Sequence, residues 1–465
     1  MKRIAWWGEL IAGLGLMTVG FLQACSLTFG KSIISMVLWP TIGLSAILCL
    51  YRLIHLPRYW KSRQFWVIVA FCLSFLLSTV LNMAYGWYDN LRTLVMQGIL
   101  FFLIYCYRPD RREETLRRNH IFTGYYLIVC ALMSLVGFGY MLLGKGEIFF
   151  PAEEAVPLYY TGFHWGRLYG IYWDPNIGAL MCCLSAVLAL DIFRRRKLLW
   201  MRLVLGFLVA LDVLYIAFSD SRTGQVALAV GMGAYVLLWM SRSKWKKYTV
   251  VGVAVALAVS ALLPVGIKAG YNALATTTAS EPAGAPEETA SGPEEPAAEP
   301  ATEPAVVVGR EEEYQGDISN RRLDIWKSAL DIFATSPAFG VGHNTILAYV
   351  EQNLPDSYLI NNDHMRFESM HNTFLDVLVA QGAVGLILYL MMAIGFFVTI
   401  IKHWEKICQV TNGESYALFA ILIAMVAASF FLSEIVYVCS PMSFLFWMAL
   451  GSLMQATQVE NTEKT

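Results

Sequence analysis

A histidine stands where a polar segment of this sequence gives way to a long apolar run. His371 and Asn372 come directly before the run, and Gly382 and Gly385 lie inside it. An imidazole whose pKa lies near neutral can act as a general base on a hydroxyl group, and a position at a membrane edge permits this. A histidine at a helix start can equally be a cap or an interfacial polar group. Both interpretations remain open from the sequence.

Two arginines are expected at the same membrane edge and could bind an anion. Arg222 lies in the turn 219–224, Ser-Asp-Ser-Arg-Thr-Gly, where backbone N–H groups could join it. Arg167 lies in a segment rich in tyrosine and tryptophan that ends at Pro175. Arginine stays protonated and presents a planar fork of donors that suits phosphate oxygens. Either arginine can instead be an interfacial anchor within an aromatic belt.

Between these residues and His371, the sequence predicts an amphipathic helix followed by a turn. The helix begins near Arg322, and Pro337, Gly340 and Gly342 then end it and force a turn. Four residues with helical spacing form its apolar stripe, namely Leu323, Trp326, Leu330 and Phe333.

Other titratable residues are also candidates for a catalytic or binding role. His343 and His364 lie in the same polar segment as His371, and His343 follows the glycine turn, which favours a role in that turn. Asp376 lies five residues after His371 and could orient or charge a site there. Asp212 and Glu434 lie within or at the edge of apolar segments, where an acid indicates function, helix capping or helix pairing.

Composition places the chain in a membrane. Of its 465 residues, 57% are hydrophobic and only 15% are charged, and the mean hydropathy is +0.53. Soluble domains carry roughly 25% charged residues. The net charge of −1 argues against a nucleic-acid partner. The nine cysteines lie in or beside apolar segments, which favours buried thiols over disulfides or a metal site.

The sequence predicts an all-α polytopic membrane protein with about twelve transmembrane helices. The first is expected to be an uncleaved membrane helix and not a signal peptide. The apolar segments that are long enough to span fall near 9–30, 33–51, 64–85, 91–107, 121–144, 175–193, 200–218, 225–241, 248–267, 372–401, 415–435 and 440–456.

The distribution of basic residues predicts the orientation. With the N-terminus in the cytoplasm, most of the 34 lysines and arginines fall on cytoplasmic segments, as the positive-inside rule requires. Both termini are then cytoplasmic, and the tail 457–465 lies inside. His371, Arg222 and Arg167 all fall on the extracytoplasmic face. The expected location is the cytoplasmic (inner) membrane.

One large extracytoplasmic loop, 268–370, separates nine spans within 1–267 from three spans within 371–456. Its part 276–309 contains mainly Pro, Glu, Ala and Thr and no aromatic residue, a composition typical of a disordered tether. Aromatic and aliphatic residues return after it. The part 314–370 is therefore expected to fold into short helices over the membrane surface.

Several motifs together resemble the superfamily of O-antigen ligases and O-antigen polymerases, which are bacterial envelope glycosyltransferases. The arrangement of twelve spans with one large loop before the last three is similar to theirs. The matching motifs are R-x-x-x-W (Arg322, Trp326), P-x-x-G-x-G (Pro337, Gly340, Gly342), H-N-x-F-L…G-x-x-G (His371 to Gly385), G-R-L-x-G-x-x-x-D-P-N (Gly166 to Asn176) and S-R-x-G (Ser221, Arg222, Gly224).

The resemblance implies a membrane enzyme with a fold like that of GT-C glycosyltransferases and a cleft at the outer face. Its donor would be a glycan on an undecaprenyl-pyrophosphate-type lipid, and its acceptor a glycan, lipid or protein hydroxyl. His371 would act as the base, Arg222 and Arg167 would neutralise the pyrophosphate, and the anomeric centre would invert. No metal or cofactor is implied. Substrate-binding roles would fall to Arg322, Asn176 and Asn372.

Two other classes of function remain as alternatives. A transporter or channel for a small anion or solute predicts charged residues near the membrane midplane and broken helices. Here Asp212 is the main midplane charge, and the candidate residues gather at one face, which favours the enzyme. A scaffold that binds cell-wall polymer would leave the arginines and histidine unexplained. Within the enzyme class, the sequence does not separate ligation from polymerisation.

Overall fold

The computed structural model describes residues 2–149, 159–280, 307–309, 319, 321–362 and 366–459. The helices of the first half are α1 (Lys2–Ala24), α2 (Ser32–Ile54), α3 (Phe65–Leu81), α4 (Trp87–Ile99), α5 (Arg112–Leu142), α6 (Pro175–Arg195), α7 (Leu199–Phe218) and α8 (Arg222–Ser241). Those of the second half are α9 (Thr249–Ser280), α10 (Arg322–Thr335), α11 (Ile346–Asn353), α12 (Thr373–Lys402), α13 (Trp404–Thr411), α14 (Ser415–Ala428) and α15 (Pro441–Gln458).

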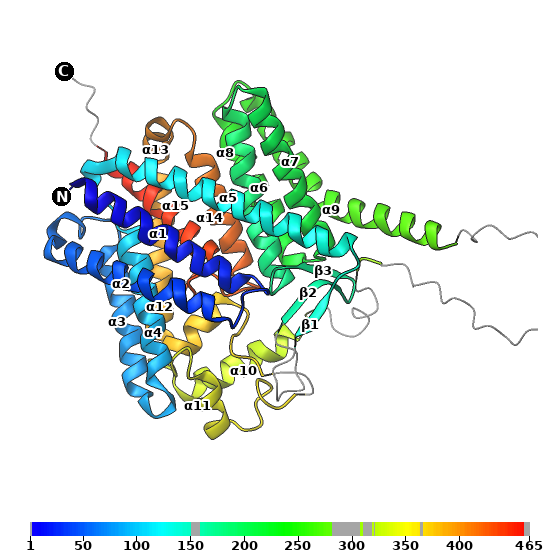
Figure 1. The fold of residues 1–465 in the computed structure, drawn as a ribbon. Helices are drawn as coiled ribbons and strands as arrows, with labels where there is room; N and C mark the ends of the chain where they lie inside the picture. The colour runs from blue at the N-terminus through cyan, green and yellow to red at the C-terminus, as the bar shows by residue number, and fades with distance from the viewer. Residues whose placement is uncertain are drawn as a thin grey trace, which may run out of the picture.

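Each of the twelve predicted spans falls on a helix, as the ribbon shows (Figure 1). Within the described residues, eight helices are individually long and apolar enough to cross a membrane, and α3 and α14 are shorter apolar helices. The predicted span 91–107 consists of α4 and a π-helical turn, Leu100–Tyr105, and the span 440–456 is α15. The protein is therefore a polytopic membrane protein.

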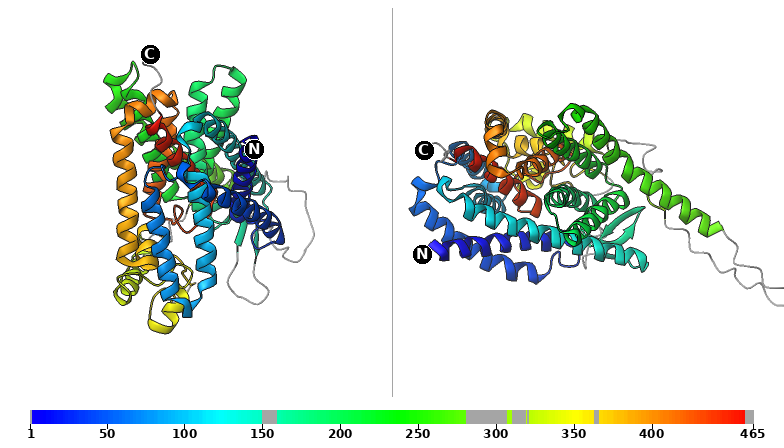
Figure 2. Two further views of the ribbon diagram at one scale, coloured as in Figure 1. Left: turned by 90° about the vertical axis from the view of Figure 1, so that its left-hand side faces the viewer. Right: turned by 90° about the horizontal axis from the view of Figure 1, so that it is seen from above.

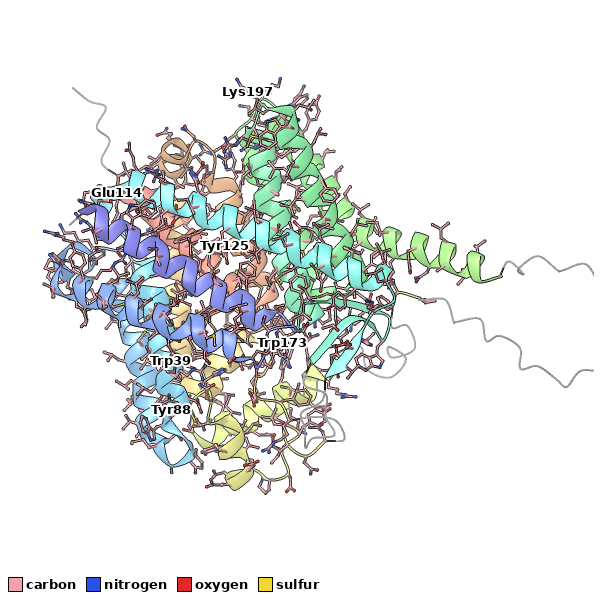
Figure 3. The ribbon with its side chains drawn as sticks, viewed as in Figure 1. Trp39, Tyr88, Glu114, Tyr125, Trp173 and Lys197 are labelled. Carbon is pink, nitrogen blue, oxygen red and sulfur yellow. The ribbon has the colours of Figure 1, made fainter. Side chains whose placement is uncertain are left out.

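Contacts between loops divide the ends of the helices into two faces. On one face, Glu414 pairs with His120 and Arg195, and Gln458 donates to the backbone of Lys61. These residues all lie on segments predicted to be cytoplasmic. Figure 3 shows the same face through Lys197 and Glu114, and in Figure 1 the start of α1 and the end of α15 lie toward it.

The opposite face gathers the segments predicted to be extracytoplasmic. Asn353 of α11 donates to the Tyr85 hydroxyl beyond α3, and the backbone N–H of Trp173 donates to the Ala24 carbonyl at the end of α1. α10 and α11 lie at this end of the bundle (Figure 1). The two groups of loops agree with helices that cross alternately up and down; which face is cytoplasmic stays a prediction from the basic residues.

The core lies where α6, α14 and α15 meet the neighbouring helices. α6 and α15 are buried along almost their whole length, whereas α9 exposes most of its surface. α9 extends away from the bundle in the view from above (Figure 2). A helix that is apolar all round but exposed in the protein has lipid as its natural surrounding.

One small sheet stands beside the helices, which the predicted all-α fold did not include. Strands β1 (Glu147–Phe149), β2 (Tyr159–His164) and β3 (Arg167–Gly170) form an antiparallel sheet in the order β1-β2-β3. The β2–β3 turn is Trp165–Gly166, and both residues have positive φ, 47° and 67°. That pattern is a type I′ turn, whose twist matches the paired strands.

At both ends of the predicted tether 276–309, the structure describes ordered residues. α9 continues as a helix to Ser280, and Val307–Gly309 lie against the folded part. Val308 is buried and exchanges two hydrogen bonds with the Asn272 side chain, while the Gly309 N–H donates to the Gly166 carbonyl. Residues 281–306 and 310–318 lie outside the described residues.

The predicted apolar stripe of α10 is not its buried face. Leu323 and Leu330 are 63% and 54% exposed, whereas Ile325, Ala329 and Ile332 are fully buried. The helix carries two apolar stripes. The buried one packs on the second hydrophobic cluster of the protein, which includes Val341, Met370 and Val379.

Candidate active site

Arg167 is fixed at the end of the helical bundle by β3. Its Nε donates to the Ser219 carbonyl oxygen at 2.8 Å, and its Nη2 donates to the Asn176 amide oxygen at 2.9 Å. The residue is only 6% exposed. Its hydrogen bonds thus reach two other segments, the end of α7 and the start of α6.

Asn176 joins two of the sequence motifs. Its amide oxygen accepts from Arg167 and also from the Ser221 hydroxyl, each at 2.9 Å. Ser221 is the N-cap of α8, and its Oγ accepts from the Gly224 N–H at 3.1 Å. A Cβ at Gly224 would meet the Cβ of Ala179 at 2.5 Å, so the glycine permits close packing of α8 on α6. Asn176 therefore has a positioning role in the structure.

Arg222 is the first residue of α8 and is exposed. The predicted turn 219–224 therefore ends at Ser221. Nearby, the Lys268 ammonium of α9 lies 3.1 Å from the Asp220 carboxylate. Arg222 and Arg167 thus lie on adjoining segments, with the Ser219–Ser221 turn between them.

His371 lies in a turn that precedes α12, with a φ of +47°. A buried carboxylate holds this turn: Asp376 accepts from the Met370 N–H at 2.7 Å and from the hydroxyls of Ser369 and Ser433. Ser369 in turn accepts from the His371 N–H at 3.1 Å. Asp376 therefore supports the backbone of His371 and does not contact its ring by any hydrogen bond in the described part.

Asn372 is the N-cap of α12. Its side-chain oxygen accepts from the N–H groups of Phe374 and Leu375, at 2.9 and 3.2 Å, and its amide nitrogen donates to the Phe430 carbonyl at 3.3 Å. Thr373 adds a backbone bond to Ser429. These bonds attach the start of α12 to the segment that follows α14.

His371 is half-buried. Among the described residues, neither ring nitrogen forms a hydrogen bond, and the ring contacts Phe367 edge-on at 6.2 Å. Burial lowers the pKa of His371, the Arg322 guanidinium lowers it further, and the Asp174 carboxylate opposes both. The ring is therefore neutral at neutral pH, the form that accepts a proton.

Asp174 connects the two halves of the site. It caps α6 by accepting from the N–H groups of Asn176 and Ile177, at 2.6 and 3.1 Å. Its charge also acts on the His371 ring. The segment that positions Arg167 through Asn176 therefore lies close enough to His371 to influence its charge.

Three helices begin at this site, and their N-termini favour anions. α6 begins beside Asp174, α8 begins at Arg222, and α12 begins after Asn372. The first N–H groups of α6 and α12 already bond to Asp174 and Asn372, but the aligned peptide dipoles of a helix still leave partial positive charge at its N-terminus. Together with the arginines, they make this end of the bundle suited to a phosphorylated ligand.

Residues 207–390 match the O-antigen ligase family. The matched part runs from α7 into α12 and includes Arg222, Arg322 and His371, whereas Arg167 and Asn176 precede it. The match implies a glycosyl-transfer activity of the O-antigen ligase or polymerase type, which acts on lipid-linked glycans. No curated protein matches the chain.

Two motifs of the segment that matches the O-antigen ligase family, P-x-x-G-x-G (337–342) and G-x-x-G (382–385), meet at a break in α12. Gly382 has φ +63° and interrupts the helix, and a Cβ there would meet the Ala338 carbonyl oxygen at 2.5 Å. The turn 337–342 occupies the break: its N–H groups bond to the carbonyls of Val379 and Ala380, and its carbonyls accept from Ala383 and Val384. The continuous span predicted at 372–401 is thus two helical pieces, and the first carries His371 at its start.

His343 is held in the glycine turn. The His343 ring stacks on Tyr437 at 4.6 Å, and its backbone N–H is held by Asn90. Burial lowers the pKa of His343 to about 4. The residue belongs to the glycine turn, as the sequence indicated. His364 lies outside the described residues.

Glu434 is a titratable residue for which the sequence left three roles open, namely function, helix capping and helix pairing. It lies in the segment after α14, is 9% exposed, and its Oε2 has no hydrogen-bond partner among the described residues. In the sequence, Glu434 stands out only as an acidic residue within an apolar segment. That pattern does not distinguish a functional site from a helix cap.

Proposed function

We propose that the protein transfers a glycan from an undecaprenyl-pyrophosphate-type lipid to an acceptor hydroxyl at the outer face of the cytoplasmic membrane. The observation that carries this proposal is that a neutral, half-buried His371 lies within the influence of Asp174, which caps the start of α6 where Asn176 holds Arg167. The electrostatic link through Asp174 supports their action in one site.

In the proposed reaction, the acceptor oxygen attacks the anomeric carbon while His371 takes the hydroxyl proton. The bond between the anomeric carbon and the pyrophosphate oxygen breaks, and the electron pair leaves with the pyrophosphate. Attack opposite the leaving group inverts the anomeric centre. His371 suits the role of base because its lowered pKa keeps the ring unprotonated at neutral pH.

Arg222 and Arg167 are proposed to stabilise the charge that grows on the pyrophosphate. Fixed charges and dipoles aimed at developing charge often contribute the largest part of catalysis. The N-terminus of α8 adds to this field. Because these groups already supply positive charge, the proposed transfer needs no metal ion or other cofactor.

Arg322 is proposed to assist at the same site. Its guanidinium lies 5.6 Å from the centre of the Phe431 ring and lowers the pKa of His371. Substrate binding by Asn176 and Asn372 is the weaker part of the proposal. Both side chains already have protein partners, which supports a positioning role for them.

The test is to delete the gene, separate surface glycans on a gel, and complement with His371→Ala, Arg222→Ala and Arg167→Ala. The proposal predicts that each variant inserts in the membrane but fails to restore the glycan. Long chains stranded on the carrier would indicate a ligase, and single repeat units a polymerase. Restored glycan in all three variants, or a defect only in solute uptake, would contradict the proposal.

A further inference from the structure

A cavity of about 260 Å³ lies at the end of the bundle opposite the candidate active site. It is enclosed by the first turns of α1, the end of α2, the loop before α3 and the start of α5. All of these segments are predicted to be cytoplasmic. The volume is slightly below the roughly 300–1,000 Å³ of pockets for drug-sized molecules, and suits a phosphate group with a few further atoms.

The wall of this cavity is strongly basic. Five arginines line it, against two carboxylates, Glu9 and Glu114. The five are Arg52, Arg58, Arg108, Arg111 and Arg118. Asp110, which pairs with Arg108 at 2.6 Å without lining the cavity, offsets one of the three excess charges. The cavity therefore retains a positive charge.

Much of this positive charge is on buried side chains, where water screens it poorly. The side chains of Arg52 and Arg118 are 3% and 8% exposed, and both donate to the single carboxylate of Glu9. The Nε of Arg118 is buried without a hydrogen-bond acceptor among the described residues. A buried donor of this kind is rare in folded proteins and indicates a missing partner.

Arg58 adds a second group without a partner in the described part of the chain. It lies at the rim, is exposed, and forms no ion pair with a described residue. Arginine is the side chain best suited to bind phosphate oxygens in pairs. Arg118 in the wall of the cavity and Arg58 at its mouth both suit the same kind of ligand, an anion.

The neighbouring surface is apolar. Ile4 on α1 and Leu53 and Ile54 on α2 adjoin lining residues in the sequence and are more than half exposed. Such exposed side chains on a membrane helix face lipid. The cavity therefore lies beside lipid-facing surface, at the depth where basic side chains meet the headgroups of the cytoplasmic leaflet.

We propose that this arginine cavity binds a phosphate-bearing anion on the cytoplasmic side of the protein. The phosphate would accept from Arg118 and Arg58 while Glu9 continues to bridge Arg52 and Arg118. An anionic phospholipid headgroup and a soluble phosphate compound share this chemistry. The adjoining apolar surface favours the lipid, because its acyl chains can lie along α1 and α2.

The test measures the thermal unfolding of the full-length protein in detergent micelles. Phosphatidylglycerol, phosphatidylcholine or sodium pyrophosphate is titrated into wild type, Arg58→Gln, Arg118→Gln and the control Arg242→Gln. Arg242 lies on the same face but does not line the cavity. Phosphatidylglycerol is expected to raise the melting temperature of wild type and Arg242→Gln, whereas phosphatidylcholine is not.

Each lost charge-assisted bond should weaken the apparent affinity about tenfold. Arg58→Gln keeps the buried triad, so it remains informative if Arg118→Gln does not fold. Stabilisation by pyrophosphate without lipid would assign the soluble source, and stabilisation by phosphatidylglycerol alone the lipid. The proposal is overturned if neither anion stabilises wild type, if phosphatidylcholine acts equally, or if Arg58→Gln retains the full response.

Discussion

Arginines are buried at both ends of this bundle, but their hydrogen bonds differ in kind. Near β3, Arg167 donates to a backbone carbonyl and to the amide oxygen of Asn176, which are neutral acceptors. At the opposite end, Arg52 and Arg118 share the carboxylate of Glu9, although Arg52 also donates to the carbonyls of Phe102 and Cys106. The first arrangement orients a guanidinium, whereas the second balances buried charges against one another.

The difference separates two consequences of mutation. Removing one partner of a buried ion pair leaves an unpaired buried charge, which lowers the stability of the fold. A hydrogen bond to a neutral group contributes only about 0.5–1.5 kcal/mol to stability. Substitution near β3 should therefore impair the reaction more than the fold, and substitution near Glu9 should impair the fold.

The largest effect is expected for Glu9→Gln. Without the carboxylate, Arg52 and Arg118 repel each other in a buried site, which should destabilise the protein by about 3–5 kcal/mol. Thermal unfolding in detergent measures the change. Glu114→Gln is the control, because its exposed pair with Arg111 should contribute less than about 1 kcal/mol. Equal losses in both variants would contradict the comparison.

Next in size is the effect of Arg167→Ala on transfer. Loss of one electrostatic donor should lower the rate about 10²- to 10³-fold, with a much smaller change in melting temperature. Arg167→Lys should restore little, because an ammonium cannot bond to Ser219 and Asn176 as the planar guanidinium does. Arg366, an exposed arginine that pairs with Glu351, provides the control Arg366→Ala. A rate loss explained entirely by unfolding would remove Arg167 from the site.

The pH dependence of transfer should report His371. The base works in its neutral form, so the rate should fall about tenfold per pH unit below the pKa of the ring and stay level above it. This acid limb should lie below pH 6.5, because burial and Arg322 lower the pKa. Arg322→Ala removes one of these causes and should move the limb to higher pH. An unmoved limb in that variant would assign the titration to another group.

A smaller effect is expected at Asn372. Asn372→Ala removes the cap of α12 and should cost about 0.5–2 kcal/mol of stability, while Asn372→Asp keeps an oxygen acceptor for the Phe374 N–H. Transfer rates and melting temperatures of both variants distinguish a helix-capping role of Asn372 from a substrate-binding role. Full activity in the aspartate variant identifies a cap; a strong rate loss at unchanged stability would instead support substrate binding.

The smallest effect is expected from shortening the predicted tether. Deleting 281–306 and joining the ends with a short Gly/Ser linker should change the transfer rate less than about twofold, because loop closure depends weakly on length. Asn272→Ala is the comparison variant, since it loses both bonds to Val308. A well-inserted but inactive deletion would show that this segment takes part in the reaction.

The sequence predicted the spans because twenty-residue apolar segments reflect the thickness of a membrane and little else. It predicted His371, Arg222 and Arg167 from motifs and from their expected place at one face. It did not predict β1–β3, whose short strands depend on pairing with one another and on packing against α5 and α6. The Trp165–Gly166 turn was the one local signal for them.

Other features depended on contacts between distant residues. The chain around α10 contains two apolar stripes, and periodicity cannot say that Ile325 and Ala329 pack inside while Leu323 stays exposed. From the sequence alone, Gly382 looks like an ordinary glycine within a membrane span. Only the structure shows that α12 breaks there and that the turn 337–342 fills the break.

The sequence by itself determined a membrane protein of many helices with its candidate reacting groups at one end. Hydrophobicity and charge act through the surrounding solvent, so composition and periodicity suffice to reveal them. Only the tertiary structure decided that Asn176 joins Arg167 to Ser221 and that Glu9 joins Arg52 to Arg118. Hydrogen bonds and ion pairs require distances near 3 Å, and the packing of segments far apart in the chain sets those distances.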